Sequence, residues 1–173
     1  LQPGDTTNVS WIQLNDQNES ISQEHFGSLE EVAALAHGRH VTMLAPGTET
    51  VLTDLEVPAV KKARLQQIVP FALEESVSED VARLHFAIGD RDSEGKVPVV
   101  ITSKEFMDHW RESIRECGIR PHEIVPEVLC LPIEENEWSV VIDTDSVMIR
   151  TGPNSGFCAD RENLIEVLNH ALN

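Results

Sequence analysis

The sequence predicts a mixed α/β fold in which two similar lobes flank a smaller inserted α/β subdomain. Short β-branched runs alternate with segments whose apolar residues recur every three or four positions, the spacing of an amphipathic helix. A hairpin followed by a helix, over residues 9–37, recurs loosely over residues 139–172. We therefore expect lobes at residues 9–78 and 126–173, the second one truncated, with the inserted subdomain at residues 79–125.

The first lobe is predicted to open with a β-hairpin. Val9–Leu14 and Ile21–Phe26 have strand patterns and are separated by a turn-forming run. Ser28 and Glu31 have the spacing of a capping box, which predicts a short helix that Gly38 ends.

Two strands and a longer helix are expected next. The strands are residues 41–45 and 51–57, separated by a Pro-Gly turn. Leu65, Ile68, Val69 and Leu73 give residues 59–73 a helical spacing. Pro70 lies inside this helix, where a proline removes a backbone donor, so we predict a kink over residues 66–70.

The inserted subdomain is predicted to contain two strands and the best-defined helix of the chain. Residues 83–88 and 96–101 are the strands. Thr102 and Glu105 have capping-box spacing, and Gly118 ends the amphipathic helix that follows. The later elements are a strand at 121–125, a helical turn at 127–131, a hairpin of 139–142 with 147–150, a turn at 154–156 and a helix at 164–172.

The charge of the chain excludes two classes of protein. The 173 residues carry 13 basic and 30 acidic side chains, so 13 − 30 gives a formal net charge of −17. The acidity is spread over both halves, which disfavours a nucleic-acid module because such binding needs clustered Lys and Arg. A hydrophobic content of 40% disfavours a disordered chain.

The cysteines and the hydropathy of the sequence indicate the kind of cellular compartment in which the chain folds. The three cysteines, Cys117, Cys130 and Cys158, are widely spaced and form neither a disulfide framework nor a CxxC motif, which indicates a reducing compartment. Cys117 lies on the apolar stripe of its helix and is expected to be buried. The sequence has no apolar run approaching membrane-spanning length. It begins at Leu1 and stops at Asn173 inside a helical pattern, so we read it as an excised piece.

The two hairpin tips argue against a nucleotide site. Phosphates are held by backbone N–H groups that glycine brings close. The tips at residues 15–20 and 143–146 contain no glycine, and both place acidic residues where a polyanion would lie. Asp143 and Asp145 could instead be metal ligands, although their neighbours indicate a turn. The seven histidines show no HExxH, HxxxH or HxH spacing.

One part of the chain resembles a known family. The resemblance lies in the order and spacing of the segments Val69–Glu75, Glu79–Phe86, Cys117–Ile119 and Val125–Pro132. These segments are similar to the cytoplasmic domain of the type II secretion system protein L family, also called general secretion pathway protein L. The specific part is the Pro-Phe-x-Leu-Glu-Glu segment at residues 70–75 together with the downstream Asp-Val-x-x-Leu-His-Phe segment at residues 80–86.

The resemblance implies an actin-like, RNase-H-related fold that has lost nucleotide hydrolysis, with no catalytic residue, cofactor or metal. It implies a single-pass inner-membrane protein, with this soluble fragment on the cytoplasmic face, that acts as a scaffold. The expected partners are the N-terminal domain of the hexameric secretion ATPase, the other inner-membrane components (the M, F and C proteins) and a second copy of the chain. Two alternatives stay open: an actin-like ATPase with divergent phosphate loops, and an RNase-H-type carboxylate metal hydrolase.

The acidity suggests where a partner would bind. A surface rich in Asp and Glu steers a basic partner, and the candidate contact residues are Glu74, Glu75, Glu79 and Asp80. The apolar residues on either side of these positions, Phe71, Leu73 and Phe86, are expected in the core.

Overall fold

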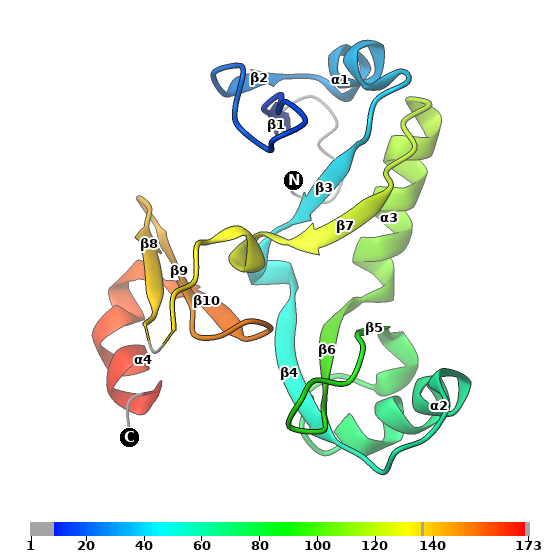
Figure 1. Ribbon diagram of the computed structural model, residues 1–173, viewed down its shortest axis with the longest axis vertical. Coiled ribbons are helices and arrows are strands. Elements are labelled where there is room, and N and C mark those ends of the chain that lie inside the picture. Colours follow the sequence, from blue (N-terminus) through cyan, green and yellow to red (C-terminus); the bar gives the residue numbers. More distant parts are fainter. Residues whose placement is uncertain (1–8, 136, 172–173) are drawn as a thin grey trace. The chain divides into compact units, whose positions relative to one another are not determined.

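The computed structural model describes residues 9–135 and 137–171 and contains a mixed set of helices and short strands (Figure 1). None of the helices in those ranges is long and apolar enough to cross a membrane. The strands are β1 Val9–Trp11, β2 His25–Gly27, β3 Thr42–Ala45, β4 Val51–Glu56, β5 Leu84–Ile88, β6 Lys96–Ser103, β7 Glu123–Pro126, β8 Ser139–Ile142, β9 Ser146–Arg150 and β10 Gly156–Asp160. The α-helices are α1 Leu29–Ala36, α2 Lys62–Leu73, α3 Lys104–Glu116 and α4 Leu164–Ala171. Short 3-10 helices are η1 Gly47–Glu49, η2 Val81–Arg83, η3 Glu127–Cys130 and η4 Arg161–Asn163.

The chain divides into two compact units. Unit 1 contains residues 1–43 and 105–124, and unit 2 contains residues 44–104 and 125–173. Strands β3 and β7 pair with each other, and each begins in unit 1 and ends in unit 2. The predicted lobes at residues 9–78 and 126–173 and the predicted inserted subdomain at residues 79–125 are a different division of the chain, and they remain a prediction.

Unit 1 is built on a small core of Val9, Leu29, Ile114 and Ile119. The predicted hairpin forms, with β1 antiparallel to β2. The capping box at Ser28 is also confirmed, since its hydroxyl accepts from the Glu31 N–H and the Glu31 carboxylate accepts from the Ser28 N–H.

The second predicted capping box, at Thr102, is wrong. Strand β6 continues to Ser103, where Thr102 pairs with His85 of β5, and helix α3 begins only at Lys104. Among the described residues the buried Thr102 hydroxyl has no hydrogen-bond partner. Strand pairing with β5 therefore prevails over the local capping signal at this position.

The larger core of unit 2 lies between α2 and an antiparallel sheet of strand order β4-β6-β5. Val97, Val99 and Ile101 of the central strand β6 alternate with less buried neighbours and are at most 3% exposed. Helix α2 contributes Leu65, Val69 and Leu73, and Figure 1 shows it beside β5 and β6. Burying each such side chain contributes about 1.5–3 kcal/mol, so this contact fixes α2 on the sheet.

A second antiparallel sheet of unit 2 has the order β10-β9-β8. Val147 and Ile149 of the central strand are fully buried. The Arg150 guanidinium donates to the backbone oxygens of Leu129 and Leu131, at 2.6 Å each, and so connects the sheet to η3 and to the residue that follows it. The sequence prediction missed β10 and placed only a turn before it.

Helix α2 runs without interruption from Lys62 to Leu73 through Pro70. The kink predicted over residues 66–70 stays a prediction. The final helix is confirmed as α4, although Leu172, its predicted last residue, lies outside the described residues.

Gly47 should be intolerant of any side chain. It is buried in η1, its N–H donates to the Glu127 carboxylate at 2.7 Å, and a Cβ there would collide with the Cys158 sulfur and lie 2.8 Å from Val128 Cγ2. We expect Gly47→Ala to lower the free energy of unfolding by about 1–3 kcal/mol, measured by chemical denaturation, because the added methyl overpacks the site.

The control for overpacking is Thr48→Ala, an exposed neighbour in the same short helix. The double variant Gly47→Ala/Cys158→Ala should lose less stability than the sum of the two single changes, since removing the sulfur makes room. Additive losses would show that the collision with Cys158 is not the cause.

Candidate protein-binding site

The four predicted contact residues lie in one short segment, which we call the acidic segment (residues 74–80). Glu74 and Glu75 directly follow α2, and Glu79 and Asp80 precede η2; all four are exposed. The N–H groups of Ser76 and Val77 both donate to the Leu73 carbonyl, at 2.9 and 3.2 Å. The segment is thus held as a turn on the end of α2.

Asp80 has a structural role as well. Its carboxylate accepts from the Ala82 N–H at 2.8 Å and caps η2. A charge change at Asp80 would therefore alter the backbone, so Glu74 and Glu79 are the better positions at which to test binding.

The charges at both ends of α2 oppose the helix dipole. The N-terminal end carries Lys61, Lys62 and Arg64 and no acid in its first turn, although that end has a partial positive charge. Glu74 and Glu75 lie at the other end, where the dipole is negative and the last turn has no base. Each misplaced charge costs about 0.3–1 kcal/mol. Charges kept against local stability are typical of a functional surface.

The prediction that Phe71 belongs to the core is wrong. Phe71 is 74% exposed, whereas Leu73 is buried as expected and Phe86 packs against the core in part. The reason is helical phase. At about 100° per residue, Phe71 lies about 200° around the helix from Val69, on the side away from the sheet.

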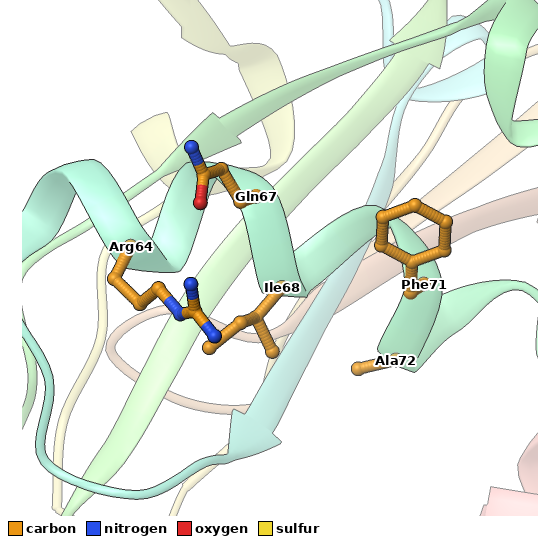
Figure 2. Close-up of a pocket in the computed structure, with 5 residues that line it drawn as sticks. All are labelled: Arg64, Gln67, Ile68, Phe71 and Ala72. Carbon is orange, nitrogen blue, oxygen red and sulfur yellow. The ribbon is translucent and has the colours of Figure 1, made fainter.

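An open apolar hollow follows this outward side of α2. It is lined by residues one turn apart, and Figure 2 shows their side chains along successive turns of the helix. The lining residues are Arg64, Gln67, Ile68, Phe71 and Ala72. The sequence prediction missed this surface because it read every large apolar residue of the helix as core. The 3- and 4-residue spacing from Arg64 through Phe71 and Ala72 was the signal that could have identified a second stripe.

The first hairpin tip uses its backbone donors internally. The Asn15 side-chain oxygen accepts from the N–H groups of Gln17 and Glu19, at 2.9 Å each, and the Asn18 N–H donates to the Asn15 carbonyl at 3.0 Å. These donors are occupied, so they do not form a cradle for phosphate.

The second hairpin tip, at residues 143–146, also uses its backbone N–H groups in hydrogen bonds within the chain. The Asp143 N–H donates to the Ser146 carbonyl at 2.9 Å, and the Thr144 N–H donates to the Asp143 carboxylate at 2.7 Å. Arg161 donates its N–H to the Asp145 carbonyl at 3.0 Å. The expected turn is confirmed, and these acidic residues shape it.

Histidine and carboxylate groups meet in unit 1 without forming a metal cluster. The rings of His40 and His122 stack with centroids 4.2 Å apart. Thr42 donates to the Glu123 carboxylate at 2.8 Å, and this hydrogen bond, with His40 nearby, lowers the pKa of Glu123. Within the described part of the chain, no group of three or more His, Cys, Asp or Glu residues could hold a metal ion.

Comparison with protein families identifies the family to which the chain belongs. The family model for type II secretion system protein L matches residues 4–172. The chain belongs to the type II secretion system protein L family, which confirms the resemblance seen in the sequence.

Curated relatives are longer than this chain. The Dickeya chrysanthemi type II secretion system protein L is 28% identical over 163 residues, which cover 92% of the chain and 41% of the relative. The Vibrio cholerae protein L is 24% identical over 135 residues, which cover 78% of the chain and 33% of the relative. The chain therefore spans less than half the length of these relatives.

Solved structures share the fold. The cytoplasmic domain of EpsL, an inner membrane component of the type II secretion system of Vibrio cholerae, matches with a TM-score of 0.79 and 21% identity over 95% of this chain and 70% of that chain. A PilM–PilN type IV pilus biogenesis complex matches with a TM-score of 0.58 and 12% identity over 97% of this chain and 63% of that chain. The predicted α/β fold class is confirmed.

The cysteines should differ sharply in reactivity. Burial raises the pKa of the Cys158 thiol to about 11, with a further contribution from the Glu127 carboxylate, whereas Cys130 is exposed. A pKa of about 11 leaves about one Cys158 thiol in a thousand ionised at pH 8. We expect iodoacetamide to label Cys130 at least about tenfold faster than Cys158, by peptide mass spectrometry.

Unfolding in guanidinium chloride supplies the control, because it should bring the two labelling rates together. Equal rates in the native protein would mean that Cys158 is not held in its buried site.

Proposed function

We propose that this chain is the non-enzymatic cytoplasmic part of an inner-membrane platform protein of the type II secretion system. It recruits the secretion ATPase by the N-terminal domain of that ATPase and links it to the membrane complex, including the M, F and C proteins. Self-association of the chain is part of this proposal. Membership of the protein L family supports the setting, and the placement of the acidic segment supports the mode of binding.

The observation that carries the proposal is the exposed acidic end of α2. Glu74, Glu75 and Glu79 project from a turn that is anchored by the buried Leu73 and the half-buried Val77. A fixed backbone presents the carboxylates without a large loss of loop entropy on binding. A basic patch on a partner would offset their unfavourable position at the helix end.

The net charge is consistent with a position at the cytoplasmic face of the inner membrane. At −17, the chain is repelled by anionic lipid, so the domain would project away from the bilayer toward a partner in solution. The EpsL domain, which shares this fold, comes from an inner membrane component.

Charge reversal at the acidic segment tests ATPase recruitment. The variant Glu74→Lys/Glu79→Lys should weaken binding of the ATPase N-terminal domain by about tenfold or more, because two attractive charges become repulsive. Binding would be measured by biolayer interferometry at two salt concentrations. In the unaltered chain, higher salt should lower mainly the association rate.

The matched control is Glu134→Lys/Glu135→Lys, an equal charge change at exposed residues elsewhere in unit 2. Equal weakening by both variants would mean that net charge alone matters. Full binding by the Glu74/Glu79 variant would remove the acidic segment from the interface.

Nucleotide titration tests the non-enzymatic part of the proposal. Because the tip donors of residues 15–19 and 143–145 are used internally, ATP with magnesium should give no binding heat and no hydrolysis up to about 1 mM. Micromolar binding or turnover would favour an actin-like ATPase instead.

A further inference from the structure

The outward side of α2 combines exposed apolar area with a charge order that local stability disfavours. Ile68 and Phe71 line an apolar hollow, with Phe71 74% exposed. Arg64 lies one turn before Ile68 on the helix (Figure 2). Glu75 lies four residues after Phe71, in the turn that follows Leu73, the last residue of α2. The order along the helix and the turn after it is thus basic, apolar, apolar, acidic.

This stripe is complementary to itself when reversed. A two-fold axis midway between residues 69 and 70 places Arg64 opposite Glu75 of another copy, and Ile68 opposite Phe71. The same axis places Gln67 opposite Ala72. Arg64 and Glu75 are 11 positions apart, and each is the same number of residues from the axis. Glu75 lies two residues beyond the end of the helix, in a turn that continues from it, where the Val77 N–H donates to the Leu73 carbonyl. Both charge pairs and both apolar contacts form in one antiparallel arrangement.

The electrostatics favour a second copy as the occupant. In the antiparallel pair, the basic end of each helix meets the acidic end of the other, which offsets the unfavourable placement of charge on each helix dipole. Two chains of −17 repel each other in general, but residues 57–73 hold three bases and no acid. Repulsion between copies is therefore weaker on this surface than the net charge of the whole chain would give. Among the described residues, neither Arg64 nor Glu75 is held in an ion pair within the chain.

We propose that two copies of this chain associate through an antiparallel α2–α2 contact, with Ile68 and Phe71 at its centre and Arg64–Glu75 pairs at its ends. This proposal rests on the proposed function in one respect: it names the residues through which the self-association included in that function would occur. A single pair of 12-residue helices buries less than a stable interface requires, so the contact is weak in isolation, with a dissociation constant in the range of about 10–1000 μM. Tethering two copies in one membrane would raise their effective concentration.

Charge swapping tests this geometry in the chain alone, without the ATPase. Sedimentation equilibrium up to about 1 mM should show a monomer–dimer equilibrium for the unaltered chain. Arg64→Glu and Glu75→Arg should each weaken it by about tenfold or more, because each change creates two like-charge pairs in a symmetric dimer. The double variant Arg64→Glu/Glu75→Arg should return to within about threefold of the unaltered chain.

Mixing the two single variants gives the most specific test of the antiparallel pairing. Arg64→Glu and Glu75→Arg should associate with each other more tightly than either does with itself, because every end pair between them is opposite in sign. Phe71→Ala should also weaken association, whereas Ile165→Ala, at an equally exposed apolar residue on α4, and Arg111→Glu on α3 should not. Circular dichroism checks that all variants keep their helix content.

Three results would overturn the proposal: a chain that stays monomeric up to about 1 mM, a double variant as weak as the single ones, or variants that all associate like the unaltered chain. In the last case, self-association would use another surface while the proposed function stands. Since Arg64→Glu leaves the acidic segment intact, ATPase binding by that variant reports on the proposed function separately.

Discussion

The packing of α2 on the sheet β4-β6-β5 determines what the rest of this surface can do. Leu65, Val69 and Leu73 form a single buried stripe, and Val69 is fully buried against the sheet. A helix with one buried stripe leaves its opposite side in solvent. The rotation that buries Val69 therefore also exposes Phe71 and directs the helix end with Glu74 outward. Fold stability and the exposure of the proposed binding surface therefore come from the same contact.

The chain shares its fold with the EpsL cytoplasmic domain, and hydrogen bonds within the chain close both of its hairpin tips. In the first tip, Asn15 occupies the backbone donors of Gln17 and Glu19. In the second, Arg161 and the strand pairing of β8 with β9 hold the turn. Carboxylates that stabilise turns need no ligand. The backbone donors of Gln17, Glu19 and Thr144 are therefore used in turns, and the charges that oppose a helix dipole lie at the ends of α2.

Features that depend on a few neighbouring residues were predictable from the sequence. Features that depend on strand pairing, or on which side of a helix packs against the sheet, were not. The capping box at Ser28 needs only its own helix, so it was identified correctly. At Thr102 the same type of signal failed because pairing with β5 extended the strand. Strand β10 was missed because its pairing with β9 is not visible in its own residues. Phe71 was misplaced because hydrophobicity was read without helical phase, although the acidic residues beside it were placed correctly at the surface.

Hydrogen–deuterium exchange of the chain with and without the ATPase N-terminal domain tests the central claim most directly. It reports on every backbone segment without any substitution. If the acidic segment forms the ATPase-binding surface, slowed exchange on adding the ATPase domain should be centred on residues 74–80, with strand β6 unchanged. Slowed exchange in other segments, with residues 74–80 unaffected, would contradict the account.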